Sequence, residues 1–289
     1  MSTFHSLKIA SVTRETSDAI SVSFEIPEPL KNTFQFIPGQ YITILYPLNG
    51  EDVRRSYSIC STPQDKNLKI AIKAVKNGAF SVFANQNLKS GDYLDVSSPE
   101  GRFTIDIAAQ NQKNYVAFVA GSGITPVFSI IKTVLEKEPN STFVLVYGNK
   151  SPDQTIFHQE LHDLELKYTG RLFIHFVYSQ AHVEPHYFGR IDKSIVNAIV
   201  RNKYKTLDFS NFFICCCFFF ISHFVFFNCF FFHLIHRFTF ATFNVSMEAQ
   251  NYLPATEPGN GTVLAELLKT DTQPQIKFND HLCVIGVWS

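Results

Sequence analysis

The apolar pattern of this chain changes at a polar linker over residues 111–114. Before the linker, short β-branched or aromatic runs alternate with turn pairs such as Pro38-Gly39 and Ser90-Gly91. Strands are expected over Leu7–Thr13, Ala19–Ile26, Tyr41–Tyr46, Arg55–Ser61, Leu68–Val75 and Tyr93–Ser97, with one helix over Phe80–Leu88. Short strands at this regular spacing predict an antiparallel β-barrel over residues 1–108.

Beyond the linker, strand and helix patterns alternate. Buried strands are expected over Tyr115–Ala120, Thr142–Tyr147, Leu172–Tyr178 and Asn211–Cys215, and helices over Thr125–Lys137, Gln154–Lys167 and Lys193–Arg201. This alternation predicts a parallel sheet over residues 113–215, with a nucleotide bound at the carboxyl ends of its strands. The expected fold class is therefore β plus α/β, an antiparallel barrel followed by a parallel-sheet nucleotide-binding domain.

One expected strand of the barrel carries side chains suited to a phosphate-bearing ligand. It has the sequence Arg55-Ser56-Tyr57-Ser58-Ile59-Cys60-Ser61, in which Arg55, Tyr57 and Ser61 are expected to share one face. The planar guanidinium of Arg55 can bind two phosphate oxygens at once. The alternative is an ordinary amphipathic strand with one exposed arginine.

A second motif, Gly78-Ala79-Phe80-Ser81, opens the helix expected within the barrel domain. A glycine turn at the start of a helix offers backbone N–H groups to a phosphate. Taken alone, the pair Gly78 and Ser81 is better explained as a helix cap. Together with the strand that carries Arg55, it predicts a site for the two phosphates of FAD.

The third motif, Gly121-Ser122-Gly123-Ile124-Thr125-Pro126, joins the first strand of the second domain to its first helix. Gly121 and Gly123 allow the backbone to approach a phosphate at the start of a helix, where Thr125 can serve as both cap and ligand contact. Pro126 suits the first helical turn. The motif predicts NADPH or NADH as a ligand, with a plain strand-to-helix turn as the alternative. Tyr147-Gly148-Asn149 and Ser179 end the next two strands, where the same ligand is expected.

In this order the motifs R-x-Y-S-x-x-S, G-x-x-S and G-S-G-I-T-P resemble the ferredoxin-NADP reductase superfamily. The resemblance covers roughly residues 5–215 and is strongest to the reductase components of oxygenases, that of phenylacetyl-CoA epoxidase among them. It implies that Arg55 contacts the FAD pyrophosphate, that Tyr57 packs on the isoalloxazine and that Ser58 bonds near the flavin N5. It also implies that Tyr57, Ser58 and Cys215 lie beside the reacting atoms, in the role of catalytic residues.

Two departures from this family bear on the nucleotide. In NADPH-using members an arginine often follows the serine equivalent to Ser179, and here that residue is Gln180. Arg171, Arg190 and Lys193 are candidates to replace it. The family also carries Cys-Gly-Pro where this chain has Cys215, Cys216 and Cys217. Side chains at the last two positions would enter the space that the nicotinamide needs, which puts hydride transfer in doubt.

The chain lacks the cysteine spacing of a second cofactor. Similar reductases carry a ferredoxin domain with a C-x4-C-x2-C ligand set, and nothing after Thr206 has that spacing. We therefore predict no iron–sulfur cluster, and residues 244–289 are an unassigned tail. The pairs His158 with His162 and His182 with His186 each lack an evident third ligand. No metal site is expected.

A phenylalanine-rich segment over residues 209–243 interrupts the pattern, and Phe212–Ile235 contains no Asp, Glu, Lys or Arg. Three interpretations stay open. T-rich DNA translated out of frame yields Phe, Ile, Cys and Ser; a segment of this length can cross a bilayer; and it could form an unusual buried core.

The formal net charge is zero, which gives no reason to expect nucleic acid as a partner. Met1–Ser11 lacks the apolar core of a signal peptide, so a cytoplasmic location is expected, or membrane attachment if Phe212–Ile235 is an anchor. The predicted function is an FAD-dependent NAD(P)H reductase that passes electrons to an acceptor protein, an iron–sulfur or oxygenase component. The alternatives are a membrane-tethered reductase and a non-catalytic flavin-binding remnant of a disrupted gene.

Overall fold

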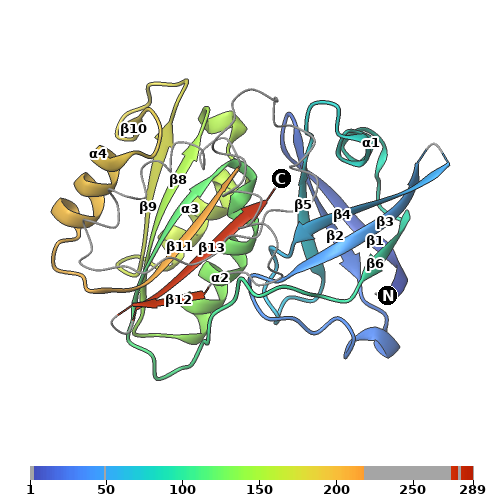
Figure 1. Cartoon of the computed structure of the whole chain (residues 1–289), viewed down its shortest axis with the longest axis horizontal. Coiled ribbons are helices and arrows are strands. Elements are labelled where there is room, and N and C mark those ends of the chain that lie inside the picture. The colour runs from blue at the N-terminus through green and yellow to red at the C-terminus, as the bar shows by residue number, and fades with distance from the viewer. Residues whose placement is uncertain (1–2, 49, 218–274, 279–280, 289) are drawn as a thin grey trace, which may run out of the picture.

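The computed structural model describes residues 3–48, 50–217, 275–278 and 281–288. Figure 1 shows two domains side by side, a β-barrel and a sheet covered by helices. Both parts of the predicted fold class are therefore confirmed. Among the described residues, no helix is both long enough and apolar enough to span a membrane.

The barrel is built from an antiparallel sheet with the strand order β4-β3-β6-β1-β2-β5 in the described residues. Its strands are β1 (Phe4–Thr16), β2 (Ala19–Glu25), β3 (Tyr41–Leu48), β4 (Glu51–Ser58), β5 (Leu68–Lys73) and β6 (Tyr93–Ser97). The sheet closes where Ile59 pairs with Ile70 and the Cys60 N–H donates to the carbonyl of Lys69 at 2.8 Å. The helix α1 (Ala79–Asn87) packs on this barrel through Phe80 and Ala84.

The second domain has a sheet in the order β10-β9-β8-β7-β11-β13-β12, as far as the chain is described. Its strands are β7 (Asn114–Ala120), β8 (Thr142–Asn149), β9 (Leu172–Tyr178), β10 (Tyr187–Phe188), β11 (Phe209–Cys217), β12 (Gln275–Phe278) and β13 (His281–Trp288). All neighbours pair in parallel except β12 with β13. Successive side chains of a strand point to opposite faces of the sheet, and helices cover both of these faces. The buried cluster on one face includes α2 (Ile124–Lys137) and α3 (His158–Lys167), and that on the other includes α4 (Lys193–Val196) and the π-helix Asn197–Lys203.

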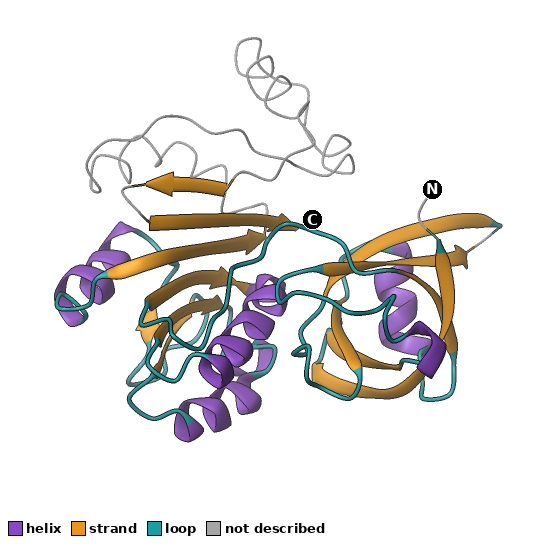
Figure 2. Cartoon of the chain, turned by 90° about the horizontal axis from the view of Figure 1, so that it is seen from below, coloured by secondary structure: helices purple, strands orange, loops and turns teal. Residues whose placement is uncertain are grey.

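Several predicted elements differ from the structure. The helix expected from Gln154 starts only at His158, because Phe157 adopts a left-handed conformation with φ of 60° and a short 3-10 turn precedes it. The tail, expected to hold no assigned element, contributes β12 and β13. Figure 2 shows these two strands continuing the sheet beyond β11.

The phenylalanine-rich segment begins inside the sheet. Its first residues form β11, between β7 and β13. The ring of Phe213 is buried and stacks on that of Phe143 with 6.0 Å between centroids. Residues 209–217 thus form the strand that was expected over Asn211–Cys215, and the three interpretations of the rest of the segment stay open. Residues 218–243 lie outside the described residues.

The two domains share one continuous buried cluster. Cys60 and Ala71 of the barrel, and Phe103 of the segment that follows it, join the buried cluster around α2. At this boundary between the two domains, the seam, the Ser129 hydroxyl of α2 donates to the carbonyl of Ser61 at 2.6 Å. The face of α2 that meets the barrel therefore positions one domain against the other.

We expect acid to destabilise this chain through His175. Its imidazole is buried and hydrogen-bonded to the Tyr204 hydroxyl at 2.9 Å. Burial, followed by the charges of Lys203 and His186, lowers its pKa from 6.5 to about 4. Because the folded pKa lies below the unfolded one, this stabilisation is complete above pH 6.5 and is lost as the pH falls toward 4.

Between pH 7 and pH 5, the His175 contribution to the free energy of unfolding is expected to fall by about 2 kcal/mol. Urea unfolding curves at the two pH values measure this change. The variant His175→Gln should lose that part of the pH dependence, and an unchanged dependence in the variant would contradict the assignment.

Candidate functional site

The predicted nucleotide loop lies at the carboxyl end of β7. Gly121–Gly123 forms a 3-10 turn that runs without a break into α2, and Gly121 has a φ of 53°. The Tyr147 hydroxyl donates to the Gly121 carbonyl at 2.9 Å, and the Thr125 hydroxyl donates to the Ser122 carbonyl at 3.1 Å. These bonds hold the turn against the neighbouring strand, with Pro126 buried in the first turn of the helix.

Gly123 and Cys215, which the sequence offers as separate candidates, lie in direct contact. A Cβ atom on Gly123 would lie 2.5 Å from the carbonyl oxygen of Cys215 and 3.2 Å from its Sγ. Cys215 itself is fully buried. The nucleotide loop therefore packs on the carboxyl half of β11, and only glycine fits at this contact.

Arg55 and Tyr57 alternate along β4, so they share one face of the strand, while Ser58 lies buried on the other. The Tyr57 ring lies 6.1 Å from the ring of Phe80, the residue before Ser81. The structure thus brings Tyr57 close to the turn that carries the second FAD motif.

That turn is closed by its own residues. Gly78 is the N-cap of α1, and a Cβ there would lie 2.4 Å from the Ser81 hydroxyl oxygen and 3.0 Å from the Val75 carbonyl. The Ser81 hydroxyl is buried and accepts from the Val75 N–H at 3.2 Å. Gly78 is therefore required for the shape of the turn, and Ser81 holds it.

Ser61 does not share the strand of Arg55 and Tyr57, contrary to the prediction. β4 ends at Ser58 because the chain turns there to close the barrel against β5. The Ser61 hydroxyl is buried and accepts from the Lys69 N–H at 3.0 Å. Ser61 thus lies at the seam between the domains.

Asn149 is a polar residue at the carboxyl end of β8. Its side-chain amide nitrogen is buried and has no hydrogen-bond partner among the described residues. Its carbonyl accepts from the N–H of Ser179 at 2.9 Å and from the Ser179 hydroxyl at 3.4 Å. The ends of β8 and β9 are tied together at the place where a nucleotide is expected.

Of the three cations proposed to replace the missing arginine, Arg171 lies at the wrong end of the sheet. It precedes β9, and its guanidinium donates to the carbonyls of Leu135, Glu138 and Ser141. Arg190 is the second residue after β10, and the Gly189 N–H before it donates to the Tyr178 carbonyl at 2.8 Å. Arg190 therefore sits at the same edge as Gln180.

The two histidine pairs differ in their contacts. His158 and His162 lie with 4.8 Å between ring centroids, while His182 stacks on Phe188 at 3.6 Å. In the part of the chain that the structure describes, no three His, Cys, Asp or Glu side chains gather as metal ligands. The pKa of His158 is lowered, first by burial and then by His162 and His186.

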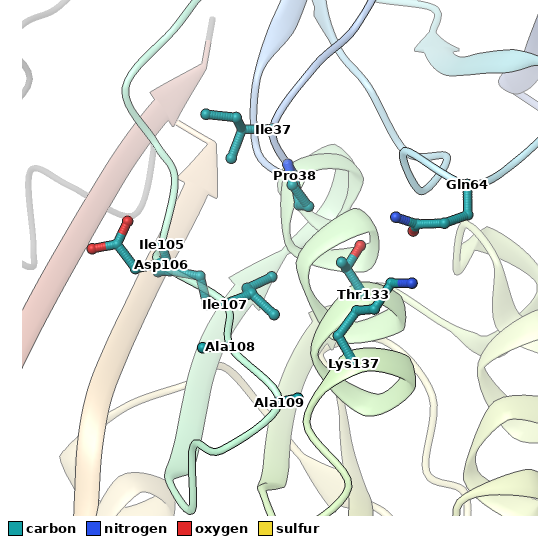
Figure 3. Close-up of a pocket in the computed structure, with 10 residues that line it drawn as sticks. All are labelled: Ile37, Pro38, Gln64, Ile105, Asp106, Ile107, Ala108, Ala109, Thr133 and Lys137. Atoms are coloured by element: carbon teal, nitrogen blue, oxygen red, sulfur yellow. The ribbon is translucent and has the colours of Figure 1, made fainter.

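A pocket of about 480 Å³ opens at the seam, near the carboxyl end of α2 (Figure 3). Its walls are Ile37, Pro38, Gln64, Ile105, Asp106, Ile107, Ala108, Ala109, Thr133 and Lys137. None of the predicted site residues lines it, because the nucleotide loop is at the opposite end of the same helix.

Comparison with known proteins supports both domains. Residues 6–105 match the family model of the oxidoreductase FAD-binding domain, and residues 118–223 match that of the oxidoreductase NAD-binding domain. The chain is 42% identical over 193 residues to a component of the 1,2-phenylacetyl-CoA epoxidase of Escherichia coli, covering 66% of this chain and 54% of that protein. It is 36% identical to the ferredoxin reductase component of 3-ketosteroid-9-alpha-monooxygenase of Rhodococcus rhodochrous, covering 58% and 47%.

Solved structures share the fold. The CS-b5R domains of human Ncb5or in the NAD+ form superpose with a TM-score of 0.67 at 24% identity, covering 80% of this chain and 67% of that one. A ferredoxin NADP+ reductase from Neisseria gonorrhoeae with bound FAD and NADP gives 0.62 at 19%, covering 77% and 89%. The chain spans about half the length of the curated relatives it matches. With an oxidoreductase FAD-binding domain followed by an oxidoreductase NAD-binding domain, the chain is built from the two domains of an FAD- and NAD-binding oxidoreductase.

Proposed function

We propose that this chain passes electrons from NAD(P)H through FAD to an acceptor protein. The observation that supports the proposal is that the nucleotide loop of the second domain lies against the barrel. Strand β5 of the barrel lies beside the Gly121–Gly123 turn, and that turn packs on Cys215. Ligands bound to the two domains would therefore meet at a single place.

The barrel residues fit FAD. Arg55 supplies a forked cation for the pyrophosphate and Tyr57 an aromatic face for the ring system. Ser58, the last residue of β4 and buried on its other face, would reach the flavin only at the end of the strand. The tight turn from Gly78 to Ser81 adds the start of α1, where N–H groups suit a phosphate. When bound, FAD accepts two electrons as a hydride and releases them one at a time. The protein binds and orients it.

The second domain fits a nicotinamide nucleotide. The closely packed turn at Gly121–Gly123 lets a phosphate approach the start of the helix, with Thr125 and Pro126 behind it. The amide nitrogen of Asn149, which has no hydrogen-bond partner in the described part of the chain, is a donor at the same edge, as is the hydroxyl of Ser179 when it turns from Asn149. Arg190 and Lys193 offer charge for the 2′-phosphate of NADPH beside Gln180.

The acceptor is proposed from the relatives. Two of them are reductase components named for a steroid monooxygenase and a glycine betaine monooxygenase. We infer that the acceptor is a protein of the same kind, an oxygenase component or an iron–sulfur protein that serves one. An aromatic acyl-CoA oxygenase is the specific candidate, because of the identity to the epoxidase component.

The proposal is tested by recording the visible spectrum of the chain loaded with FAD, without oxygen, before and after adding NADPH and then NADH. Bleaching of the flavin band is expected, and the faster nucleotide reports whether Arg190 and Lys193 replace the missing arginine. A flavin that binds but stays oxidised with both would overturn the proposal. That outcome would favour the non-catalytic remnant, and Cys216 and Cys217 would be the first residues to replace in search of the cause.

We expect Arg55→Met to weaken FAD binding by about 10- to 100-fold, because a hydrogen bond to a charged group contributes roughly 1.5–3 kcal/mol. Quenching of FAD fluorescence during titration measures the affinity. Arg54→Met is the matched control, since Arg54 is the preceding residue, lies on the other face of β4 and has its guanidinium over the Phe4 ring. Equal losses in the two variants would contradict the assignment.

A further inference from the structure

A single lysine of the barrel bridges the two domains. The Lys69 ammonium lies 2.9 Å from a carboxylate oxygen of Glu160 in α3 and 3.7 Å from one of Glu15 in β1. It also lies over the ring of Phe157, 5.2 Å from the centroid. Glu15 and Lys69 belong to the barrel, whereas Glu160 and Phe157 belong to the second domain, so the contacts cross the seam.

The positive charge of Lys69 and the negative charges of its two carboxylate partners compensate each other. The Glu15 side chain is 9% exposed, and its buried Oε1 atom accepts no hydrogen bond from any residue that the structure describes. Lys69 is therefore the cation that compensates this carboxylate. Burial acts to lower the pKa of Lys69, but Glu160 and then the other nearby acidic groups raise it above its ordinary value. The ammonium stays charged at neutral pH.

On the far side of the seam, the contact reaches the core of the second domain. Phe157 is held at a positive φ of 60°, a strained conformation for a residue with a side chain. Its ring stacks on that of Phe128 in α2 with 4.6 Å between centroids. The helix α2 starts at the nucleotide loop, so Lys69 is joined through two rings to the element that carries this loop.

We propose that Lys69 is a positioning residue that holds the two domains at the separation needed for transfer between nucleotide and flavin. Without its ammonium, the carboxylates of Glu15 and Glu160 would face each other across the seam without compensation. The domains would separate there, and the distance between the reacting atoms would grow. The kinetic part of this inference rests on the proposed function.

The thiol of Cys60 can report whether the seam is open or closed. This side chain is fully buried at the domain boundary, and its Sγ donates to the Lys69 carbonyl at 3.2 Å. Burial raises the pKa of the thiol to about 12, so it reacts slowly while the seam is closed. Its rate of alkylation, followed by peptide mass mapping, measures opening without any need for electron transfer.

The experiment compares Lys69→Met, Lys69→Arg and Lys73→Met, each loaded with FAD. Lys73 is the matched control, because it lies on the same strand with similar exposure. It pairs at 3.6 Å with Asp18, which belongs to the same domain, so this ion pair does not cross the seam. Two quantities are measured: the alkylation rate of Cys60, and the limiting rate of flavin reduction at saturating NADPH or NADH.

For Lys69→Met we expect faster alkylation of Cys60 and a limiting rate lower by about tenfold or more, with the nucleotide concentration at half-maximal rate unchanged. Lys69→Arg keeps the charge and should restore both quantities, and Lys73→Met should match the parent chain. Alkylation and rate that do not differ between Lys69→Met and Lys73→Met would overturn the proposal. If Lys69→Met opens the seam but no chain is reduced by either nucleotide, the role of Lys69 in holding the domains together stands, and the proposed function fails with the kinetic part of this inference.

Discussion

The Gly123→Ala variant is expected to bind FAD normally and to be reduced by NAD(P)H about a hundredfold more slowly than the parent chain. The added methyl group would lie 2.5 Å from the carbonyl oxygen and 3.0 Å from the carbonyl carbon of Cys215. Those are backbone atoms of a central strand, so the nucleotide loop must move away from β11. Overpacking of this kind costs about 1–3 kcal/mol of stability, and the displaced loop no longer places the nicotinamide.

The measurement is the anaerobic rate of flavin reduction by nucleotide, set against reduction of the same variant by dithionite. Dithionite needs no nucleotide site, so its rate should not change. Gly91→Ala is the control for stability, because Gly91 lies in a barrel turn at a φ of 94° with nothing near its side-chain position. A Gly123→Ala chain reduced by nucleotide as fast as Gly91→Ala would mean that the contact with Cys215 does not shape the site.

The sequence predicts the elements of this fold well where local pattern decides them. The barrel strands other than β4, and the parallel strands β7, β8, β9 and β11, were expected close to their observed bounds, because burial on one or both faces leaves a clear spacing of apolar residues. Gly121, Gly123 and Cys215 were all named as candidates, although only the structure shows that Gly123 and Cys215 touch.

The failures arise where contacts distant in sequence decide the outcome. Helix α3 starts late because the left-handed Phe157 stacks on Phe128, a contact that no helical pattern reveals. Ser61 leaves the strand of Arg55 because β4 must meet β5 to close the barrel. Arg171 looked available for a phosphate, but it binds carbonyls at the opposite end of the sheet.

The sequence of the tail contains a strand pattern that the prediction did not use. Leu282–Trp288 is an apolar run of the length of a buried strand, yet it follows a long segment with no interpretable period. Only the pairing of β13 with β11 identifies it as part of the sheet. Lys69 was missed for a similar reason, since a lysine at the start of a strand is ordinarily solvated and its acidic partners lie on two other elements.

Glu138→Ala is expected to lower the free energy of unfolding by about 4 kcal/mol, the largest stability loss that we predict for one side chain, because each buried donor left without a partner costs roughly 1–3 kcal/mol. Glu138 is fully buried. One carboxylate oxygen accepts from the Asn111 amide at 2.6 Å and from the Ala108 N–H at 3.2 Å. The other accepts from the Tyr115 hydroxyl at 2.8 Å and the Ser141 hydroxyl at 2.7 Å.

The loss matters for function because these donors include the segment that joins the domains. Ala108 and Asn111 lie between the barrel and β7, and Glu138 fixes them to the end of α2. Urea unfolding followed by circular dichroism measures the change. Glu138→Gln keeps one acceptor oxygen and should lose about half as much, whereas Glu136→Gln, at an exposed position of the same helix, should lose almost nothing. If Glu138→Ala were no less stable than Glu136→Gln, the carboxylate would not be the clamp that holds the linker.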